Sequence, residues 1–357
     1  MRTRMIMRKR WLTTIPILVV VIASLFLIQL PYFTMSPGAA LELSPIVQVQ
    51  GGYRDEKGKL MMTTVRTDRA TLFSYLYAQL SPTTDLVPLQ QILSPNEDVN
   101  QYFKRQEAVM KDSQQTAIIV AFQKANVPIQ VINKGAVVTE IIPGMPAEKL
   151  LKAGDVITAV DGEKVENAEE LISALRGRSK GEKVELSLLR EGSPMTITIP
   201  LAPFPTEWQI KGEGQKVGIG IYSPAAEREV IPSKKVNFKT EHIGGPSAGL
   251  MFTLELINQL TPGDLTKGYA IAGTGTISMD GTVGPIGGIQ HKVVGAKRKG
   301  AAIFFAPDNP PLPGERSNYE DAVEANKRLN LGLKIIPVKK LDDALNYLSS
   351  LPPNGER

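Results

Sequence analysis

The stretch Gly244-Gly-Pro-Ser-Ala-Gly249 decides the architecture of the C-terminal half of the chain, because it joins two different patterns. Residues 236–240 before it read as a strand, and the apolar-rich residues 250–260 after it predict a buried helix. Two glycines and a proline ahead of Ser247 predict a tight turn that places this serine at the helix N-terminus. Unpaired N–H groups and the helix dipole can stabilise an oxyanion there, although a serine at this point can also be a simple N-cap.

A second segment, Gly284-Pro-Ile-Gly-Gly-Ile-Gln-His-Lys292, leads into a helix predicted from about Gly288. Ile289, Lys292, Val293 and Ala296 then share one face. On an apolar stripe, desolvation lowers the pKa of Lys292, so this lysine could act as a general base toward a serine hydroxyl. The alternative is a lysine that extends its amine to the surface.

Together with Gly273-Thr-Gly-Thr-Ile277, these segments resemble the proteolytic domain of the Lon-type serine peptidases. The resemblance is close from Val236 to about Pro307 and loose over the rest of 208–348. It implies that Ser247 is the nucleophile and Lys292 the general base, that Thr274 orients Lys292, and that backbone N–H groups around Ser247 form the oxyanion hole. The supporting residues are Gly245, Pro246 and Ala248. Gly244 departs from the charged residue that many members carry there, which would loosen or regulate the site and spare the dyad.

Three other interpretations of this region remain open. A Ser–His pair would use His242, five residues before Ser247, or His291, which points about 100° away from Lys292 on a helix. A non-catalytic PDZ adaptor would keep the peptidase-like domain only as a scaffold. An esterase or amidase would act on small molecules.

Residues 127–203 have a different pattern, with five short strand signals at 129–131, 136–142, 156–160, 184–189 and 196–199 and one helix at 168–175. The motifs Gly135-Ala-Val-Val-Thr-Glu-Ile-Ile-Pro-Gly-Met-Pro-Ala147, Leu150-Leu-Lys-Ala-Gly-Asp-Val-Ile157 and Val160-Asp-Gly162 resemble a bacterial PDZ domain, a small, partly open barrel. The resemblance implies a peptide groove beside a helix starting near Asn167, with a carboxylate-binding loop just before Ile129. No clean Gly-Leu-Gly-Phe loop occurs there, so free C-termini and internal segments are both open as ligands.

The N-terminus predicts a membrane anchor. Residues 1–10 carry five basic residues and no acidic one, and Trp11 to Leu30 is a run of 20 residues without a charge. Such a helix matches the thickness of bilayer hydrocarbon, and the charge asymmetry predicts a cytoplasmic N-terminus with the following domains outside the cell. A signal peptide cleaved near Gly38-Ala39-Ala40 is the alternative. With this anchor, the whole chain resembles the membrane-anchored, PDZ-containing Lon-like proteases of Gram-positive bacteria.

The expected organisation is therefore α+β with five parts: a basic tail at 1–10, a transmembrane anchor at 11–30, a segment at 31–126, a PDZ domain at 127–203 and a Lon-type proteolytic domain at 206–350. Within 31–126 we expect a short tether to residue 44, a hairpin over 45–65, and mostly helices from 70, including a long one over 101–126. The middle segment is expected to pack on the proteolytic domain.

Composition excludes several function classes. Without the five basic residues of the tail, the 41 Lys and Arg fall to 36, equal to the 36 Asp and Glu, so the charge does not indicate nucleic acid. With no cysteine and two histidines, we expect no metal and no cofactor. No G-x-x-x-x-G-K-[ST] occurs, so we expect no nucleotide and ATP-independent cleavage of peptides or unfolded segments. The resemblance to ring-forming Lon-type domains implies a homo-oligomer.

Overall fold

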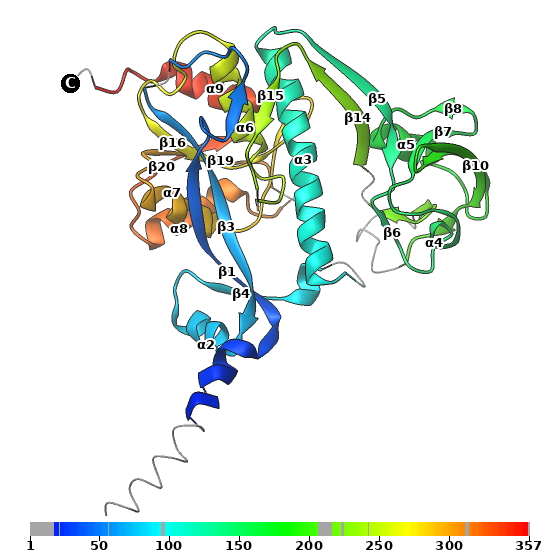
Figure 1. Ribbon diagram of the computed structural model, residues 1–357, viewed down its shortest axis with the longest axis horizontal. Helices are drawn as coiled ribbons and strands as arrows, with labels where there is room; N and C mark the ends of the chain where they lie inside the picture. The colour runs from blue at the N-terminus through cyan, green and yellow to red at the C-terminus, as the bar shows by residue number, and fades with distance from the viewer. Residues whose placement is uncertain are drawn as a thin grey trace, which may run out of the picture. The chain divides into compact units, whose positions relative to one another are not determined.

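A computed structural model describes residues 18–20, 22–55, 57–93, 97–205, 216–222, 225–241, 243–310 and 314–355 (Figure 1). The chain divides into two compact units. The first combines residues up to Pro128 with residues from Pro232 onward, and the second is Ile129–Ile231. The second unit is thus inserted between two parts of the first.

The first unit is built on a six-stranded mixed sheet in the order β20-β19-β16-β3-β1-β4. The strands β16 (Ala270–Gly273), β19 (Ile303–Pro307) and β20 (Lys334–Val338) are parallel to one another, and β16 is also parallel to β3 (Lys59–Thr71). On the other side of β3, β1 (Gln29–Glu42) and β4 (Asp85–Pro88) continue the sheet in antiparallel pairing. The N-terminal segment therefore supplies half of the strands of this sheet.

Strand β1 overturns two predictions, the tether over 31–44 and the hairpin over 45–65. Residues 31–42 belong to β1, which pairs with β3, whereas β2 (Val47–Val49) pairs with β15 (Val236–Phe238). Pro37 and Gly38 indicated a break in the chain, but they lie at an irregularity of the ladder between Pro37 and Ala40. There a Cβ on Gly38 would lie 2.6 Å from the carbonyl oxygen of Thr64, and the Thr64 hydroxyl bonds to the backbone of Ala39 instead.

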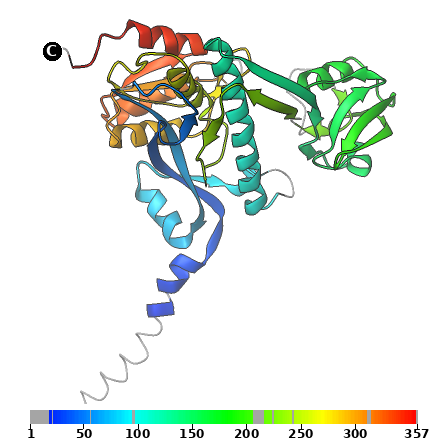
Figure 2. The ribbon, with the colours of Figure 1, turned by 45° about the horizontal axis from the view of Figure 1, so that its top comes forward.

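Helices cover both faces of this sheet (Figures 1 and 2). On one face, α7 (Ile289–Arg298) and α8 (Asn318–Arg328) share a buried apolar cluster with Met61, Ala272 and Phe304. Side chains alternate along a strand, so the neighbouring Phe305 points to the other face, where it contacts Tyr347 of α9 (Leu341–Ser350). The helix α6 (Gly249–Leu260) is buried along its whole length, and α3 (Val99–Lys124) packs on it.

The second unit is a small β structure with short helices. Its main sheet contains β10 (Ser193–Pro200), β9 (Lys183–Arg190), β7 (Val156–Val160), β5 (Ile129–Val137) and β14 (Ala225–Pro232), with β8 (Glu163–Lys164) paired to β7. The helices are α4 (Ala147–Leu150) and α5 (Ala168–Leu175), and α5 has the predicted bounds. Two further pairs, β6 (Glu140–Ile141) with β13 (Ile221–Tyr222) and β11 (Ala202–Pro203) with β12 (Val217–Gly218), complete it.

The second unit extends beyond the predicted boundary at residue 203. Residues 216–222 and 225–231, assigned from the sequence to the proteolytic domain, lie in this unit. Ile219 is buried in its core, and β14 pairs with β5. The pairing of β13 with β6, 80 residues earlier in the chain, is not visible from local sequence patterns.

Part of the predicted anchor, residues 11–17 and 21, lies outside the described residues. Residues 18–20 and 22–27 of it are helical, and Gln29 and Leu30 already belong to β1 because Gln29 pairs with Thr71. In the part of the chain that the structure describes, no helix is both long and apolar enough to span a bilayer.

The remaining elements of the first unit lie between β3 and α7 in the sequence. After β3 follow α2 (Leu72–Leu80), β4 and a 3-10 turn at Leu89–Gln91, so the mostly helical segment expected from residue 70 includes a strand. The long helix predicted at 101–126 is α3, at 99–124. A short hairpin of β17 (Thr276–Ile277) and β18 (Val283–Gly284) precedes α7.

Candidate active site

Ser247 lies in the tight turn between β15 and α6, as predicted. Gly245 has a φ of +89°, a conformation that favours glycine, and the N–H of Gly249 donates to the carbonyl of Pro246 at 3.2 Å. The N-cap of α6 is Ala248, and no side chain caps the helix. The Ser247 hydroxyl is half-buried and does not cap α6. The alternative that this serine is a simple N-cap is therefore wrong.

Helix α3 holds the turn from the outside. The N–H of Gly245 donates to the backbone oxygen of Gln106 at 2.8 Å, and the Ser113 hydroxyl donates to the carbonyl of Pro246 at 3.0 Å. A Cβ on Gly244 would stand 2.7 Å from the Cβ of Gln106. The glycine at 244 therefore lets α3 approach the turn closely, and any side chain there would have to displace the helix or the turn.

The carbonyl of Ser247 is fixed by the Thr274–Gly275 segment after β16. It accepts from the Thr274 hydroxyl at 2.9 Å and from the N–H of Gly275 at 2.8 Å, and the N–H of Leu250 donates back to Gly275 at 3.0 Å. Gly275 has a φ of +149°, and a Cβ there would meet Val283 at 2.7 Å. The position of Ser247 is thus determined by two contacts from a strand end 27 residues away.

Lys292, on α7, reaches the same point from the other side. Its side chain is 3% exposed, so the alternative of a lysine extending to the surface is wrong. Its Nζ lies 2.8 Å from the Oγ of Ser247, 2.9 Å from the carbonyl oxygen of Thr63 on β3, and 3.1 Å from the Oγ1 of Thr274. The sequence-predicted residues Ser247, Thr274 and Lys292 therefore meet, and Thr63 joins them.

The donors and acceptors around the Lys292 Nζ determine which atom donates in each of its three hydrogen bonds. The carbonyl of Thr63 can only accept, and the Thr274 hydroxyl already donates its proton to the carbonyl of Ser247. An uncharged Lys292 amine has two protons, which these two oxygens accept. Its lone pair then faces the Ser247 hydroxyl, which is the orientation required of a base.

Burial also favours the uncharged form of this lysine. Desolvation lowers the pKa of Lys292 from 10.5 to about 7. None of the three groups bonded to its Nζ is a carboxylate that would restore the charge. Near neutral pH a large share of the molecules therefore holds a neutral amine beside the Ser247 hydroxyl.

Two backbone donors lie at the turn that carries Ser247. The N–H groups of Ser247 and Ala248 have no hydrogen-bond partner within the described ranges, and they precede the first turn of α6. A developing oxyanion at Ser247 would lie near these donors and the positive end of the helix dipole.

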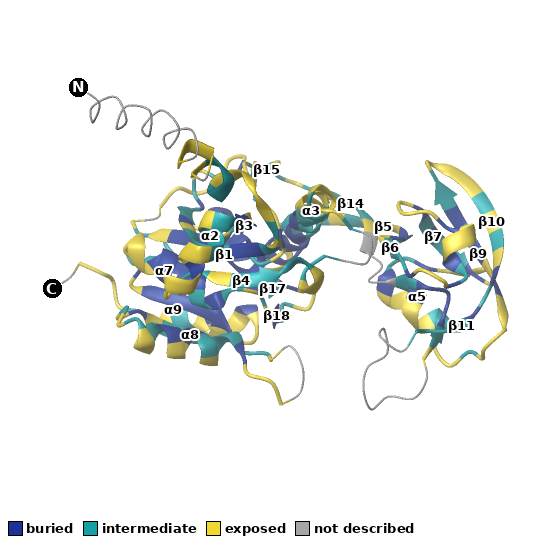
Figure 3. Ribbon diagram, turned by 90° about the horizontal axis from the view of Figure 1, so that it is seen from below, coloured by how far each residue is buried: buried dark blue, intermediate teal, exposed yellow. Residues whose placement is uncertain are grey.

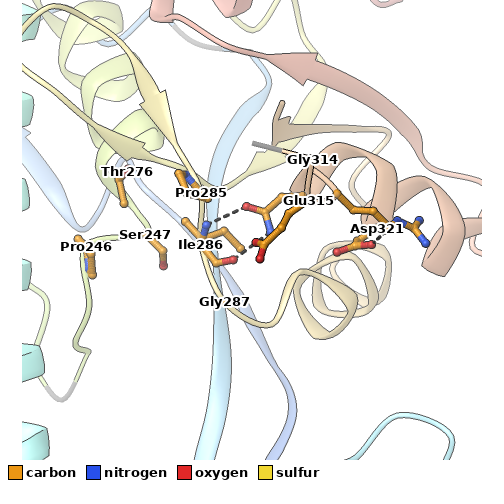
Figure 4. A pocket seen from close by; sticks show the side chains of 11 residues that line it. Pro246, Ser247, Thr276, Pro285, Ile286, Gly287, Gly314, Glu315 and Asp321 are labelled. Atoms are coloured by element: carbon orange, nitrogen blue, oxygen red, sulfur yellow. Dashed lines mark hydrogen bonds and ion pairs between the residues drawn. The ribbon is translucent and has the colours of Figure 1, made fainter. Parts of the chain in front are cut away.

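Two cavities reach Ser247 and share Pro246, Ser247 and Gly287 as lining residues. The first, of about 800 Å³, has a polar far wall that includes Glu315, Arg316 and Asp321 (Figure 4). The second, of about 510 Å³, also reaches Lys292 and is mainly apolar. Its apolar walls come from β1, β3 and α3 and include Met35, Leu41, Met62, Val65, Tyr102, Phe103 and Met110.

Of the two histidines, the structure describes only His291. His242 lies outside the described residues, and the buried His291 directs its Nε2 to Asp85, 3.1 Å away on β4. Desolvation lowers the pKa of His291, against the opposing effect of Asp85. Within the described ranges no three His, Asp or Glu side chains are grouped to hold a metal ion.

The second unit contains a separate groove of about 640 Å³ along α5. Leu171, Ile172 and Leu175 line it from the helix, and the segment from Lys216 to Ile221 lines it from the opposite side. The loop expected before Ile129 does not contribute to it. Arg176, the C-cap of α5, and Arg178 also line it, and Arg178 is paired with Asp161 and Glu182.

Residues 241–350 match the family model of the Lon protease (S16) C-terminal proteolytic domain. Residues 109–201 match the model of a PDZ domain. The chain therefore carries a PDZ domain and a Lon-type proteolytic domain, and these matches support a serine peptidase.

Individual relatives cover only parts of the chain. A Lon protease from Trichlorobacter lovleyi is 36% identical over 101 residues, which is 28% of this chain and 11% of that protein. The periplasmic pH-dependent serine endoprotease DegQ of Escherichia coli is 38% identical over 71 residues, 20% of this chain and 16% of that protein. The chain thus spans less than a fifth of the length of either relative. Among solved structures, the PDZ domain of an SdrC-like protein from Listeria monocytogenes is 25% identical, covers 25% of this chain and 85% of its own, and has a TM-score of 0.22.

Proposed function

We propose that this protein is a membrane-tethered, ATP-independent serine endopeptidase in which Ser247 and Lys292 form the catalytic dyad. The observation that carries the proposal is the 2.8 Å contact between the Ser247 hydroxyl and a lysine that is 3% exposed. A buried amine with its pKa lowered to about 7 can take a proton from a hydroxyl near neutral pH.

The proposed reaction proceeds in two halves. Neutral Lys292 takes the Ser247 proton as Oγ bonds to the peptide carbonyl carbon, and the N–H groups of Ser247 and Ala248 stabilise the oxyanion. The C–N bond then breaks, and the Lys292 ammonium returns its proton to the leaving amine. In the second half, Lys292 takes a proton from water, which attacks the acyl-enzyme and releases the new carboxyl end. The proton on Lys292 returns to Ser247.

The two cavities support cleavage within a chain rather than at its end. They meet at Ser247, so a polypeptide can extend to both sides of the scissile bond. The extracellular location, the single-pass anchor with a cytoplasmic N-terminus and the homo-oligomer are part of the same proposal. They rest on the charge pattern of residues 1–30 and on the resemblance to Gram-positive Lon-like proteases.

We further propose that the groove along α5 selects substrates by peptide binding. Leu171, Ile172, Leu175, Val217 and Ile221 would receive an apolar side chain. The positive charge of Arg176 in this groove suits a C-terminal carboxylate. We therefore favour free C-termini over internal segments as its ligands.

A quenched-peptide library with the full chain in detergent tests the catalytic proposal. Ser247→Ala and Lys292→Met should each lower kcat/KM by about 10³-fold or more, since nucleophile and base act as a unit. The matched control is Lys297→Met, an exposed lysine on the same helix, which should cleave like the wild type. Added ATP should change nothing. If the wild type binds peptides but does not cleave them, the protein is a non-catalytic PDZ adaptor. If it cleaves small esters but no peptide, it is an esterase.

A further inference from the structure

The helix α2 (Leu72–Leu80) presents an apolar face that the proteolytic site does not use. Its sequence, Leu-Phe-Ser-Tyr-Leu-Tyr-Ala-Gln-Leu, contains no charged residue, and its one buried residue is Ala78. Phe73, Leu76, Tyr77 and Leu80 are exposed, from 46% for Phe73 to 87% for Leu80. They follow i, i+3, i+4, i+7 spacing, which places them on one face of the helix. Figure 3 marks the exposed parts of α2 in yellow.

This stripe continues into the apolar N-terminal helical segment. The Phe26 and Phe73 rings stack with their centroids 4.9 Å apart, and the N–H of Leu72 donates to the carbonyl of Ile28 at 3.1 Å. The described part of the segment also exposes large apolar side chains, among them Leu18, Ile22 and Leu27. The two elements lie side by side in Figures 1 and 3. Because the Phe26–Phe73 stack joins them, we treat their exposed apolar side chains as one surface.

The uncharged segment that precedes α2 in the sequence indicates that lipid covers this apolar surface. The uncharged run that starts at Trp11 ends at Leu30, directly beside the start of α2. If the run enters a bilayer, the end of α2 that is bonded to Ile28 lies where the run leaves it. Tyr32 and Tyr75, whose rings are 5.4 Å apart, add the aromatic residues that favour the boundary between lipid and water.

We propose that α2 lies in the boundary layer of the same bilayer, with Phe73, Leu76, Tyr77 and Leu80 directed into the lipid. The inference rests on the proposed membrane tether and adds a second contact to it. Two contacts, joined through the β1–β3 ladder at Gln29 and Thr71, restrict how the proteolytic unit is oriented against the membrane.

Lipid-depth measurements on the full chain test this proposal, since the chain has no cysteine and any single cysteine can be labelled. Leu80→Cys and Leu76→Cys report on α2, Leu27→Cys reports on the tether, and Val323→Cys on α8 is an exposed control in the same unit. Each carries an environment-sensitive fluorophore in phosphatidylcholine–phosphatidylglycerol vesicles, with doxyl-labelled lipid or aqueous iodide as quencher. Thermal unfolding of each variant confirms that it is folded.

We expect lipid quenching at positions 76 and 80 at least about threefold stronger than at 323, and Leu80→Glu should reduce it at position 76. Lipid quenching at 27 with iodide quenching at 80 would overturn the docking of α2 and leave the tether intact. Iodide quenching at both 27 and 80 would overturn the tether and with it this inference. Protection of position 80 from both quenchers would show that protein, such as a second copy, covers α2, and would also overturn it.

Discussion

The first unit contains two regions that contribute differently to the site. Residues 241–350, which match the Lon-type family model, supply Ser247, Thr274 and Lys292. Residues 29–124 precede that match, yet they supply the Thr63 carbonyl bonded to Lys292, the Gln106 carbonyl bonded to the serine turn and most of the apolar cavity. The reacting groups thus come from the region with recognisable motifs, whereas part of their positioning and most of the apolar cavity come from the other.

This division shows that the family match covers only part of the candidate site. The matched region alone lacks one of the three groups bonded to the Nζ of Lys292 and the helix that packs on the serine turn. We therefore expect substitution of Lys292 to affect proton transfer, substitution at the contact between α3 and the serine turn to affect geometry, and substitution in the cavity walls from residues 29–124 to affect substrate choice.

The largest effect is expected on stability, at Lys292. The unfolded chain binds a proton to this lysine up to a pH near 10.5, and the folded chain only up to about 7. Between these values the unfolded state holds more protons, so the free energy of unfolding of the wild type rises with pH. In Lys292→Met this dependence is absent. The stability of the variant relative to the wild type should therefore be greatest at pH 6 and fall by about 5 kcal/mol at most toward pH 10.5.

Urea unfolding of both proteins at pH 6, 8 and 10 measures this difference. Lys297→Met is the control, because its side chain is exposed on the same helix. A difference between wild type and Lys292→Met that stays constant with pH would show that burial does not disfavour the charged lysine.

The next largest effect is expected where α3 meets the serine turn. In Gly244→Ala the new Cβ would lie 2.7 Å from the Cβ of Gln106, and either the turn or the helix must move. A shift of about 1 Å at a nucleophile costs on the order of 100-fold in rate, so kcat should fall by about that factor with little change in KM. Steady-state kinetics and a thermal melt of the variant check this. An unchanged kcat would show that α3 is only a covering helix.

A smaller effect is expected in the apolar cavity. Phe103 on α3 lines it and is 41% exposed, so Phe103→Ala should remove apolar contact area without opening the core. For a peptide with a large apolar side chain beside the scissile bond, KM should rise about fivefold while kcat stays within about twofold. The same substitution should not affect a peptide with a small side chain at that position. Equal losses for both peptides would place the binding of that side chain elsewhere.

The sequence predicted the elements whose signals are local. The helices at 168–175, 249–260 and 289–298 follow from periodicity and turn residues over short windows, whereas the same periodicity left both burial and extension to the surface open for Lys292. Strand β1 was missed because Pro37 and Gly38 normally interrupt strands, and only the approach of Thr64 explains them here. The Thr63 and Gln106 carbonyls could not be found from motifs, since any residue type provides a carbonyl and only the long-range pairing of β3 and α3 brings them to the site. The strands β12, β13 and β14 were assigned to the proteolytic domain because their pairing with strands of the second unit is also not visible in the local sequence.

The most direct test of a neutral, buried Lys292 beside Ser247 is the pH dependence of kcat/KM for a peptide without ionisable side chains. The rate should rise tenfold per pH unit below an apparent pKa near 7 and reach a plateau above about pH 8, because only the uncharged amine can take the serine proton. An apparent pKa near 10, or a rate independent of pH between 5.5 and 9, would contradict the proposed role of Lys292.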